Sequence, residues 1–168
     1  FIYGTTASAD FPTTPSAFQQ NFNGGAGFSP SGIGVSFPNG SDIFVSRLLA
    51  NLVNLLASTF IGGTGNDGLN IAPQLKYNYA DEVRGEIDID QQNNIYIATC
   101  TKSTDFPTTN SLQNNSNGSQ EGCVIKMDNQ LTSIILSTYL GVANYDSIYS
   151  LALDKNDDIY VTGGRNSA

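Results

Sequence analysis

Asp10-Phe11-Pro12-Thr13-Thr14 decides the fold, because the same five residues return as Asp105-Phe106-Pro107-Thr108-Thr109. A second segment, Ser-Thr-Phe-Ile-Gly at residues 58–62, is similar to Ser-Thr-Tyr-Leu-Gly at residues 137–141. Self-similarity of this kind is the sequence signature of a repeat architecture. We therefore expect the 168-residue chain to be built from copies of one structural unit.

A third pair of similar segments completes the repeat, at residues 90–97 and 154–161. The three pairs are 95, 79 and 64 residues apart, in the order in which they occur. Because the separation shrinks in two steps, the first copy is expected to carry two insertions, of 16 and 15 residues. We place one within residues 21–39, which are rich in Gly, Ser and Pro, and the other within residues 69–84.

Each copy contains the same short runs of β-branched and aromatic residues, bounded by turn residues, and these predict β-strands. The only helix-like run, residues 47–56, aligns with a segment that has Asp128-Asn129-Gln130 at its centre, so we interpret it as a turn between strands. Nine strands are expected, in groups of three, four and two. They lie at residues 1–5, 43–48 and 55–61; 86–89, 95–101, 123–128 and 134–140; and 150–153 and 159–163.

Four short antiparallel strands in a repeat of 64 residues indicate a propeller blade. The predicted fold is all-β, a partial β-propeller of about two and a quarter four-stranded blades of a larger propeller. Residues 1–61 form three strands of a first blade, 62–85 a connecting loop with an insertion, 86–140 one complete blade, and 141–168 the start of a third. A β-sandwich and a β-solenoid are the alternatives, but a sandwich leaves the verbatim repetition unexplained and a solenoid usually has a shorter period.

The order of the motifs resembles the SBBP-type bacterial β-propeller repeat. Tyr-Ile/Val-x-x-x-Thr precedes Asp-Phe-Pro-Thr-Thr, then come Val-x-Lys/Arg, Ser-Thr-Tyr/Phe-Leu/Ile-Gly and Asp-x-x-x-Asn/Asp-Ile-Tyr. The resemblance covers nearly the whole chain apart from the insertions, and it implies a large secreted or cell-surface bacterial protein without general catalytic residues. The chain departs from the usual pattern where Asn93 and Asp157 replace a turn glycine, although both residue types tolerate the left-handed conformation.

The repeated pentapeptide is expected to be structural. Asp10 and Asp105 are predicted to accept hydrogen bonds from backbone N–H groups two residues on, which opens a turn. Pro12 and Pro107 fix their own φ angle and confine the preceding residue to an extended conformation. This geometry is expected to direct the aromatic rings at the second position, Phe11 and Phe106, inward to cap the blade.

Cys100 and Cys123 are the only cysteines and fall outside the repeat pattern. One ends a predicted strand and the other begins the next, so antiparallel pairing predicts a disulfide that closes a loop of roughly twenty residues and contributes about 3 kcal/mol. An oxidising location at the cell surface agrees with such a bridge. Two buried thiols in a blade core are the alternative.

An acidic strip is the strongest charge feature. Glu86, Asp88 and Asp90 alternate with isoleucines on a strand expected to be innermost, so their carboxylates are candidates for a cation such as Ca²⁺ beside the central channel. The spacing matches no recognised calcium motif, and a solvated edge that prevents strand aggregation is the favoured alternative. We expect no cofactor, with Ca²⁺ as the one candidate.

The composition narrows the function further. A net charge of −8 argues against a nucleic-acid partner, and the absence of histidine excludes His-based zinc sites and Ser-His triads. No apolar run approaches the roughly 20 residues of a membrane span. Because Phe1 is the first residue and a strand-like run closes the sequence, we expect a fragment of a longer polypeptide, with any targeting segment outside it.

Three functional interpretations follow. The favoured one is a non-catalytic propeller segment of a secreted or cell-surface bacterial protein, a scaffold or protein-interaction platform whose partners are the remaining blades and other surface proteins or glycans. The second is a glycan-binding propeller that uses Tyr77 and Tyr79 of the second insertion, because loops on rigid scaffolds carry function. The third is part of a polysaccharide-active enzyme, although no pair of carboxylates is singled out by its context.

Overall fold

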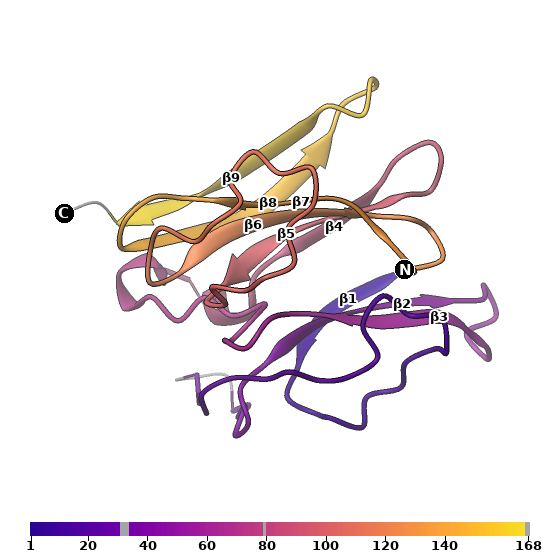
Figure 1. Ribbon diagram of the computed structural model, residues 1–168, viewed down its shortest axis with the longest axis horizontal. Helices are drawn as coiled ribbons and strands as arrows, with labels where there is room; N and C mark the ends of the chain where they lie inside the picture. Colours follow the sequence, from indigo (N-terminus) through magenta and orange to yellow (C-terminus); the bar gives the residue numbers. More distant parts are fainter. Residues whose placement is uncertain (31–33, 79, 167–168) are drawn as a thin grey trace.

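The computed structural model describes residues 1–30, 34–78 and 80–166, and its regular structure is almost entirely β. Three antiparallel sheets follow one another in the chain, with three, four and two strands (Figure 1). Two single turns of 3₁₀ helix, η1 and η2, interrupt the connection between the first two sheets. The bounds are β1 Ile2–Thr6, β2 Asp42–Leu48, β3 Leu55–Ile61, η1 Pro73–Leu75, η2 Asp81–Val83, β4 Glu86–Ile89, β5 Ile95–Thr101, β6 Glu121–Met127, β7 Ile134–Leu140, β8 Tyr145–Leu153 and β9 Ile159–Asn166.

The all-β prediction is confirmed, and the described residues contain the nine expected strands in groups of three, four and two. β3, β4, β5 and β7 have the predicted bounds. β8 differs most, because it starts at Tyr145 rather than at Ser150. An irregularity in its register between Ile148 and Ser150 allows the pairing with β9 to continue past a local bend. The three sheets do not close on one another.

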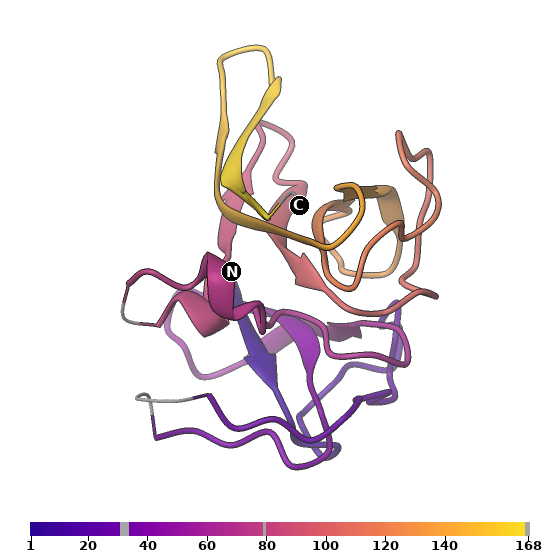
Figure 2. The same cartoon turned by 90° about the vertical axis from the view of Figure 1, so that its left-hand side faces the viewer.

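The three sheets are stacked in chain order, with the β1–β3 sheet at one end and the β8–β9 hairpin at the other, and a view turned by 90° shows the same order (Figures 1 and 2). Successive side chains of a strand point to opposite faces of its sheet. In β5, Ile95 and Ile97 contact the first sheet, whereas Tyr96 and Ala98 contact the third. All seven residues of β5 are therefore buried. The strand lacks the alternation of buried and exposed side chains that is found in a sheet with one solvent-exposed face.

The first sheet has one face that no other sheet covers. Ile43 and Val45 of β2 point into the core shared with the second sheet, so Phe44 between them points to the opposite face. On that face Phe44 is half-buried, and Ile2 of β1 remains 46% exposed. Phe60 of β3, which pairs with Phe44, is nevertheless completely buried.

The hairpin turns are as expected. Asn93 and Asp157 both have a φ of 64°, so these residues adopt the left-handed conformation where the repeat pattern has glycine. The run interpreted as a turn rather than a helix joins β2 to β3. Leu52 in that turn has a φ of 60° and Leu131, 79 positions later in the β6–β7 turn, has a φ of 59°. None of the described helices is long and apolar enough to cross a membrane.

Candidate functional sites at the sheet junctions

The second copy of the pentapeptide packs into the core. The ring of Phe106 is buried, with its centroid 6.2 Å from that of Tyr139. The Phe106 N–H donates a hydrogen bond of 2.9 Å to the Tyr139 hydroxyl, which itself donates to the Ser103 carbonyl at 2.7 Å. Tyr139 thus contacts both the backbone and the side chain of Phe106.

The first copy packs in the same way but against other aromatic rings. The Phe11 centroid lies 4.3 Å from that of Phe44 and 6.0 Å from that of Phe60, and Phe22 approaches Phe60 from the connection between β1 and β2. Tilted rings at these separations are favourable arrangements. The rings of Phe11 and Phe22 thus cover Phe60 on the face of the first sheet that no other sheet covers, which explains why Phe60 is buried.

The prediction for the two aspartates is wrong. The residue two positions after each is a proline, which has no N–H to donate. Instead, Asp105 Oδ1 accepts hydrogen bonds from the backbone N–H and the hydroxyl of Thr64, at 2.9 and 3.1 Å. Asp105 therefore joins the second sheet to the loop that leaves the first, while Asp10 is exposed.

A polar cluster around Asp42 joins the connection between β1 and β2 to the first sheet. Asp42 Oδ2 accepts from the Asn23 N–H and the Gln19 amide, and Oδ1 accepts from the Gly24 N–H, at 2.8, 3.2 and 3.0 Å. Gln19 Oε1 in turn accepts from the Gly62 N–H at 3.0 Å. Burial raises the pKa of Asp42 to about 6, although these donors oppose the shift.

The second sheet repeats this cluster around Glu121. Glu121 Oε1 accepts from the N–H groups of Asn117 and Gly118, at 2.7 and 2.6 Å. Gln113 Oε1 accepts from the Gly141 N–H at 3.1 Å. Every one of these residues follows its counterpart by 94 positions in the loop or by 79 in the sheet.

A further carboxylate stands at each junction with the next sheet. Asp67 Oδ2 accepts from the Gly63 N–H and the Ser103 hydroxyl, at 2.8 and 2.7 Å, and Thr101 donates to Oδ1. Burial raises the pKa of Asp67 to about 7. In the next junction Asp146 Oδ2 accepts from the Val142 N–H at 2.8 Å.

These clusters were missed in the sequence, although a signal for them is present. Gln19 and Gln113 are each followed after four residues by Asn-Gly, and the two copies share one offset. Glutamine and Asn-Gly occur often enough in loops that neither attracts notice beside a verbatim Asp-Phe-Pro-Thr-Thr. The clusters show that the repeat extends into the loops.

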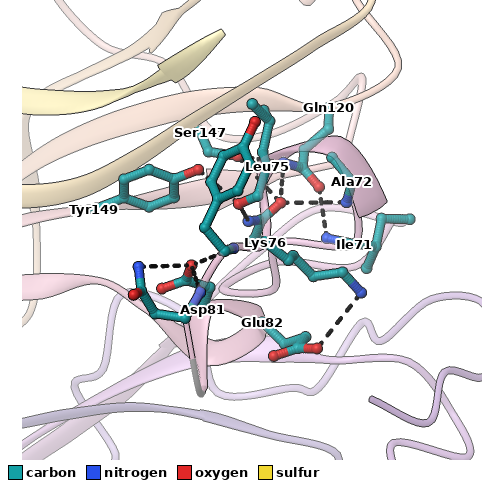
Figure 3. Close-up of polar contacts among 12 residues, drawn as sticks. Ile71, Ala72, Leu75, Lys76, Asp81, Glu82, Gln120, Ser147 and Tyr149 are labelled. Carbon is teal, nitrogen blue, oxygen red and sulfur yellow. Dashed lines mark hydrogen bonds and ion pairs between the residues drawn. The ribbon is translucent and has the colours of Figure 1, made fainter. Parts of the chain in front are cut away.

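The second insertion is fixed at its base by buried side-chain amides (Figure 3). Gln120 Oε1 accepts from the Ile71 N–H at 2.7 Å, while its amide group donates to Asn70 Oδ1 and to the Ser147 hydroxyl at 2.9 and 2.8 Å. Asn70 Oδ1 also accepts from the Ala72 N–H at 3.2 Å. Because Gln120 directly precedes β6 of the second sheet and Ser147 lies in β8 of the third, the insertion is held where these two sheets meet.

The tip of the insertion is held by charged groups. Asp81 Oδ2 accepts from the N–H groups of Tyr77 and Asn78, both at 2.8 Å, and Lys76 lies 3.5 Å from the Glu82 carboxylate (Figure 3). Both acidic residues, Asp81 and Glu82, are buried. The Tyr77 side chain is 80% exposed and faces solvent, as a contact residue requires. Tyr79, the second predicted contact, lies outside the described residues.

The three predicted metal ligands are not brought together. Glu86 Oε2 accepts from the Leu151 N–H, and Asp88 Oδ2 from the Leu153 N–H, at 3.0 and 3.3 Å, so both carboxylates join β4 to β8. Asp90 is buried beyond the end of β4 and forms an ion pair of 3.0 Å with Lys126. Among the described residues no group of three or more Asp, Glu or Cys side chains is placed to hold a metal ion.

The predicted disulfide between Cys100 and Cys123 is wrong. Both cysteines are free and buried. Cys123 pairs with Thr99 rather than with Cys100, which pairs with Gly122. Side chains of paired residues share a face and those of neighbours do not, so the two thiols lie on opposite faces of the sheet. Burial raises the pKa of the Cys100 thiol to about 11.

Comparison with protein families agrees with the resemblance drawn from the motifs. The sequence model of the family described as SBBP, beta-propeller repeat, matches residues 137–163, which run from β7 through β8 into β9. A search of curated proteins gave no match. The expected family resemblance is thereby confirmed for this segment: the chain carries a beta-propeller repeat of the SBBP family at residues 137–163.

Proposed function

We propose that the chain is a segment of a β-propeller whose outer faces are covered by further repeats, and that it serves as a non-catalytic scaffold or protein-interaction platform. One comparison carries this proposal. Leu131 in the β6–β7 turn is completely buried against the first sheet, whereas Leu52, its counterpart in the β2–β3 turn, is 73% exposed. The same residue in the same turn is covered in one copy and bare in the other.

The neighbouring positions repeat this difference. Cys123 and Tyr139 correspond to Phe44 and Phe60, and both lie in the core between the first and second sheets. The face with Phe44 is therefore equivalent to a face that packs on a preceding sheet. A preceding four-stranded repeat that offers side chains like those of β2 would bury it in the same way.

The third sheet offers a second uncovered surface. Ile159 and Tyr160 of β9 correspond to Ile95 and Tyr96 of β5, which are buried. In β9 their side chains are 37% and 61% exposed. Two further strands along β9 and another sheet on its outer face would give these residues the environment of β5. A repeat architecture in which every unit needs its neighbours accounts for both surfaces.

We propose a secreted or cell-surface bacterial location, because proteins with SBBP repeats are generally extracellular and bacterial. The net charge of −8 supports protein or glycan partners over nucleic acid. A rigid stack of sheets with loops fixed at the junctions suits the presentation of binding surfaces.

Covalent footprinting of the full-length polypeptide with a carbene reagent tests the proposal. Leu52 and Tyr160 are expected to be labelled as weakly as the buried Leu131. Leu112, which is 84% exposed in a surface loop, is the matched control and should be labelled strongly. Strong labelling of Leu52 and Tyr160 in the folded, full-length polypeptide would show that no further repeat covers them.

Glycan recognition by the second insertion is the second candidate, and the exposed Tyr77 on an anchored loop favours it. An amphipathic tyrosine with few rotamers is a good contact for sugars. A glycan array probed with the wild type and with Tyr77→Ala and Tyr79→Ala variants tests this candidate. Binding that the two substitutions abolish would support it, and binding that they leave unchanged would exclude these residues as contacts.

A further inference from the structure

Two carboxylates approach the same glycine at each sheet junction. A Cβ atom on Gly141 would lie 1.9 Å from Glu121 Oε2 and 2.8 Å from Asp146 Oδ2. A Cβ atom on Gly62 would lie 2.6 Å from Asp42 Oδ1 and 2.8 Å from Asp67 Oδ2. Glycine is required at both positions, because the carboxylates occupy the space that any side chain would need.

The Glu121 carboxylate is only half satisfied. Its Oε1 accepts two backbone N–H groups, but Oε2 is buried without a hydrogen-bond partner, and the whole side chain is inaccessible to solvent. A buried charged oxygen without a donor is costly. Protonation of Oε2 removes the charge and creates an O–H donor that points into the space shared with Asp146.

The surrounding charges do not compensate both carboxylates. Arg165 on β9 lies 4.0 Å from Asp146 Oδ1 and is more than half exposed, so it screens Asp146 weakly. The loop of residues 113–118 offers only neutral groups, and no Lys or Arg in the described part of the chain forms an ion pair with Glu121. Burial, together with the nearby charge of Asp146, raises the pKa of Glu121.

We propose that Glu121 and Asp146 share one proton, carried on Glu121 Oε2 and donated to Asp146 Oδ2, and that this carboxyl–carboxylate hydrogen bond fastens the second sheet to the third. Loss of the proton to solvent leaves two facing carboxylates and weakens the junction. Asp42 and Asp67 approach Gly62 in the same way one junction earlier, but there every carboxylate oxygen accepts a hydrogen bond. The junction between the second and third sheets is thus more stable at mildly acidic than at alkaline pH.

Carbon-13 NMR of the chain labelled at the glutamate carboxyl carbon tests the shared proton directly. The sequence has only three glutamates, namely Glu82, Glu86 and Glu121, so three signals are expected. Hydrogen bonds from Ser150 and Leu151 lower the pKa of Glu86, which makes that residue an internal control. We expect the Glu121 signal to titrate at a higher pH than that of Glu86.

Substitution supplies the second readout. Glu121→Gln keeps a neutral donor facing Asp146, so the fall in stability between pH 5 and pH 8 should be smaller than in the wild type, as measured by urea unfolding, with the remainder due to Asp42 and Asp67. Glu86→Gln is the matched control and should leave that fall in place. A Glu121 signal that titrates at or below that of Glu86, or an unchanged pH dependence in Glu121→Gln, would overturn the proposal. If Glu121→Gln does not fold, the titration of the wild type decides, with Glu82→Gln and Glu86→Gln identifying the other signals.

Discussion

Leu131 in the β6–β7 turn and Leu52 in the β2–β3 turn can each be replaced by alanine. The two stability losses, compared, test which faces of the sheets are covered. Leu131 is completely buried, and it belongs to the same core cluster as Ile43 and Ala57 of the first sheet. Removal of three carbons from a buried leucine costs about 2–5 kcal/mol, since the lost transfer energy adds to the cost of the cavity. For Leu131→Ala in the middle of this range we expect a loss of about 3 kcal/mol.

Leu52→Ala is the matched control in the same chain. Both leucines occupy left-handed turn positions, and each N–H donates to the carbonyl three residues earlier, at 2.8 Å for Leu52 and 3.0 Å for Leu131. The backbone cost of the substitution is therefore the same. Because only about a quarter of the Leu52 side chain is covered, the loss should stay below about 1 kcal/mol.

Urea unfolding followed by tyrosine fluorescence measures both losses. The dependence of the free energy on urea must stay unchanged for the two variants, which shows that the denatured state is the same. Equal losses for Leu52→Ala and Leu131→Ala in the 168-residue chain would refute the assignment of a covered and an uncovered face. In the full-length polypeptide the loss for Leu52→Ala should rise toward that of Leu131→Ala.

Three further predictions concern titration, thiols and the insertion. Because burial raises the pKa of Asp67 to about 7, the folded state binds its proton more tightly than the unfolded state does, so stability should fall as pH rises from about 4 to 7. Asp67→Asn should flatten this fall in urea unfolding curves recorded across that range. Cys100 and Cys123 should react with a thiol reagent only after unfolding, and a mobility change on reduction in electrophoresis would contradict their separation. Gln120→Ala should leave the Ile71 N–H without its acceptor and increase hydrogen exchange across residues 70–78, whereas unchanged exchange would show that other contacts hold the insertion.

The strands were predictable because their residues carry two signals at once. In β5, Ile95 and Tyr96 have high strand propensity, and the same pair returns at the same place in the repeat. The turns were predictable for a related reason, since Asn93 and Asp157 are among the few residue types that accept a positive φ.

The cysteines show what sequence position alone leaves open. A shift of pairing by a single residue moves a side chain to the other face of a sheet. Cys100 and Cys123 are close along the two strands, but Cys123 pairs with Thr99 and so points away from Cys100. No pattern in the sequence fixes the register of β5 and β6 to one residue.

The acidic residues were grouped correctly along the chain but not in space. Glu86 and Asp88 accept backbone N–H groups of β8, an element more than 50 residues away. Asp90 turns instead toward Lys126 on β6. Contacts between distant segments of this kind depend on how the sheets stack, which the spacing of the carboxylates does not report.

The matched segment, residues 137–163, begins within β7 of the second sheet, contains β8 and ends within β9 of the third sheet. A duplication of the 64-residue repeat with its boundary inside a sheet adds strands that complete the sheet before it and others that begin the sheet after it. Each new sheet is therefore assembled from two copies of the coding repeat. With such a boundary, each added copy restores a sheet at its junction with the copy before it, and no new strand pairing has to arise there.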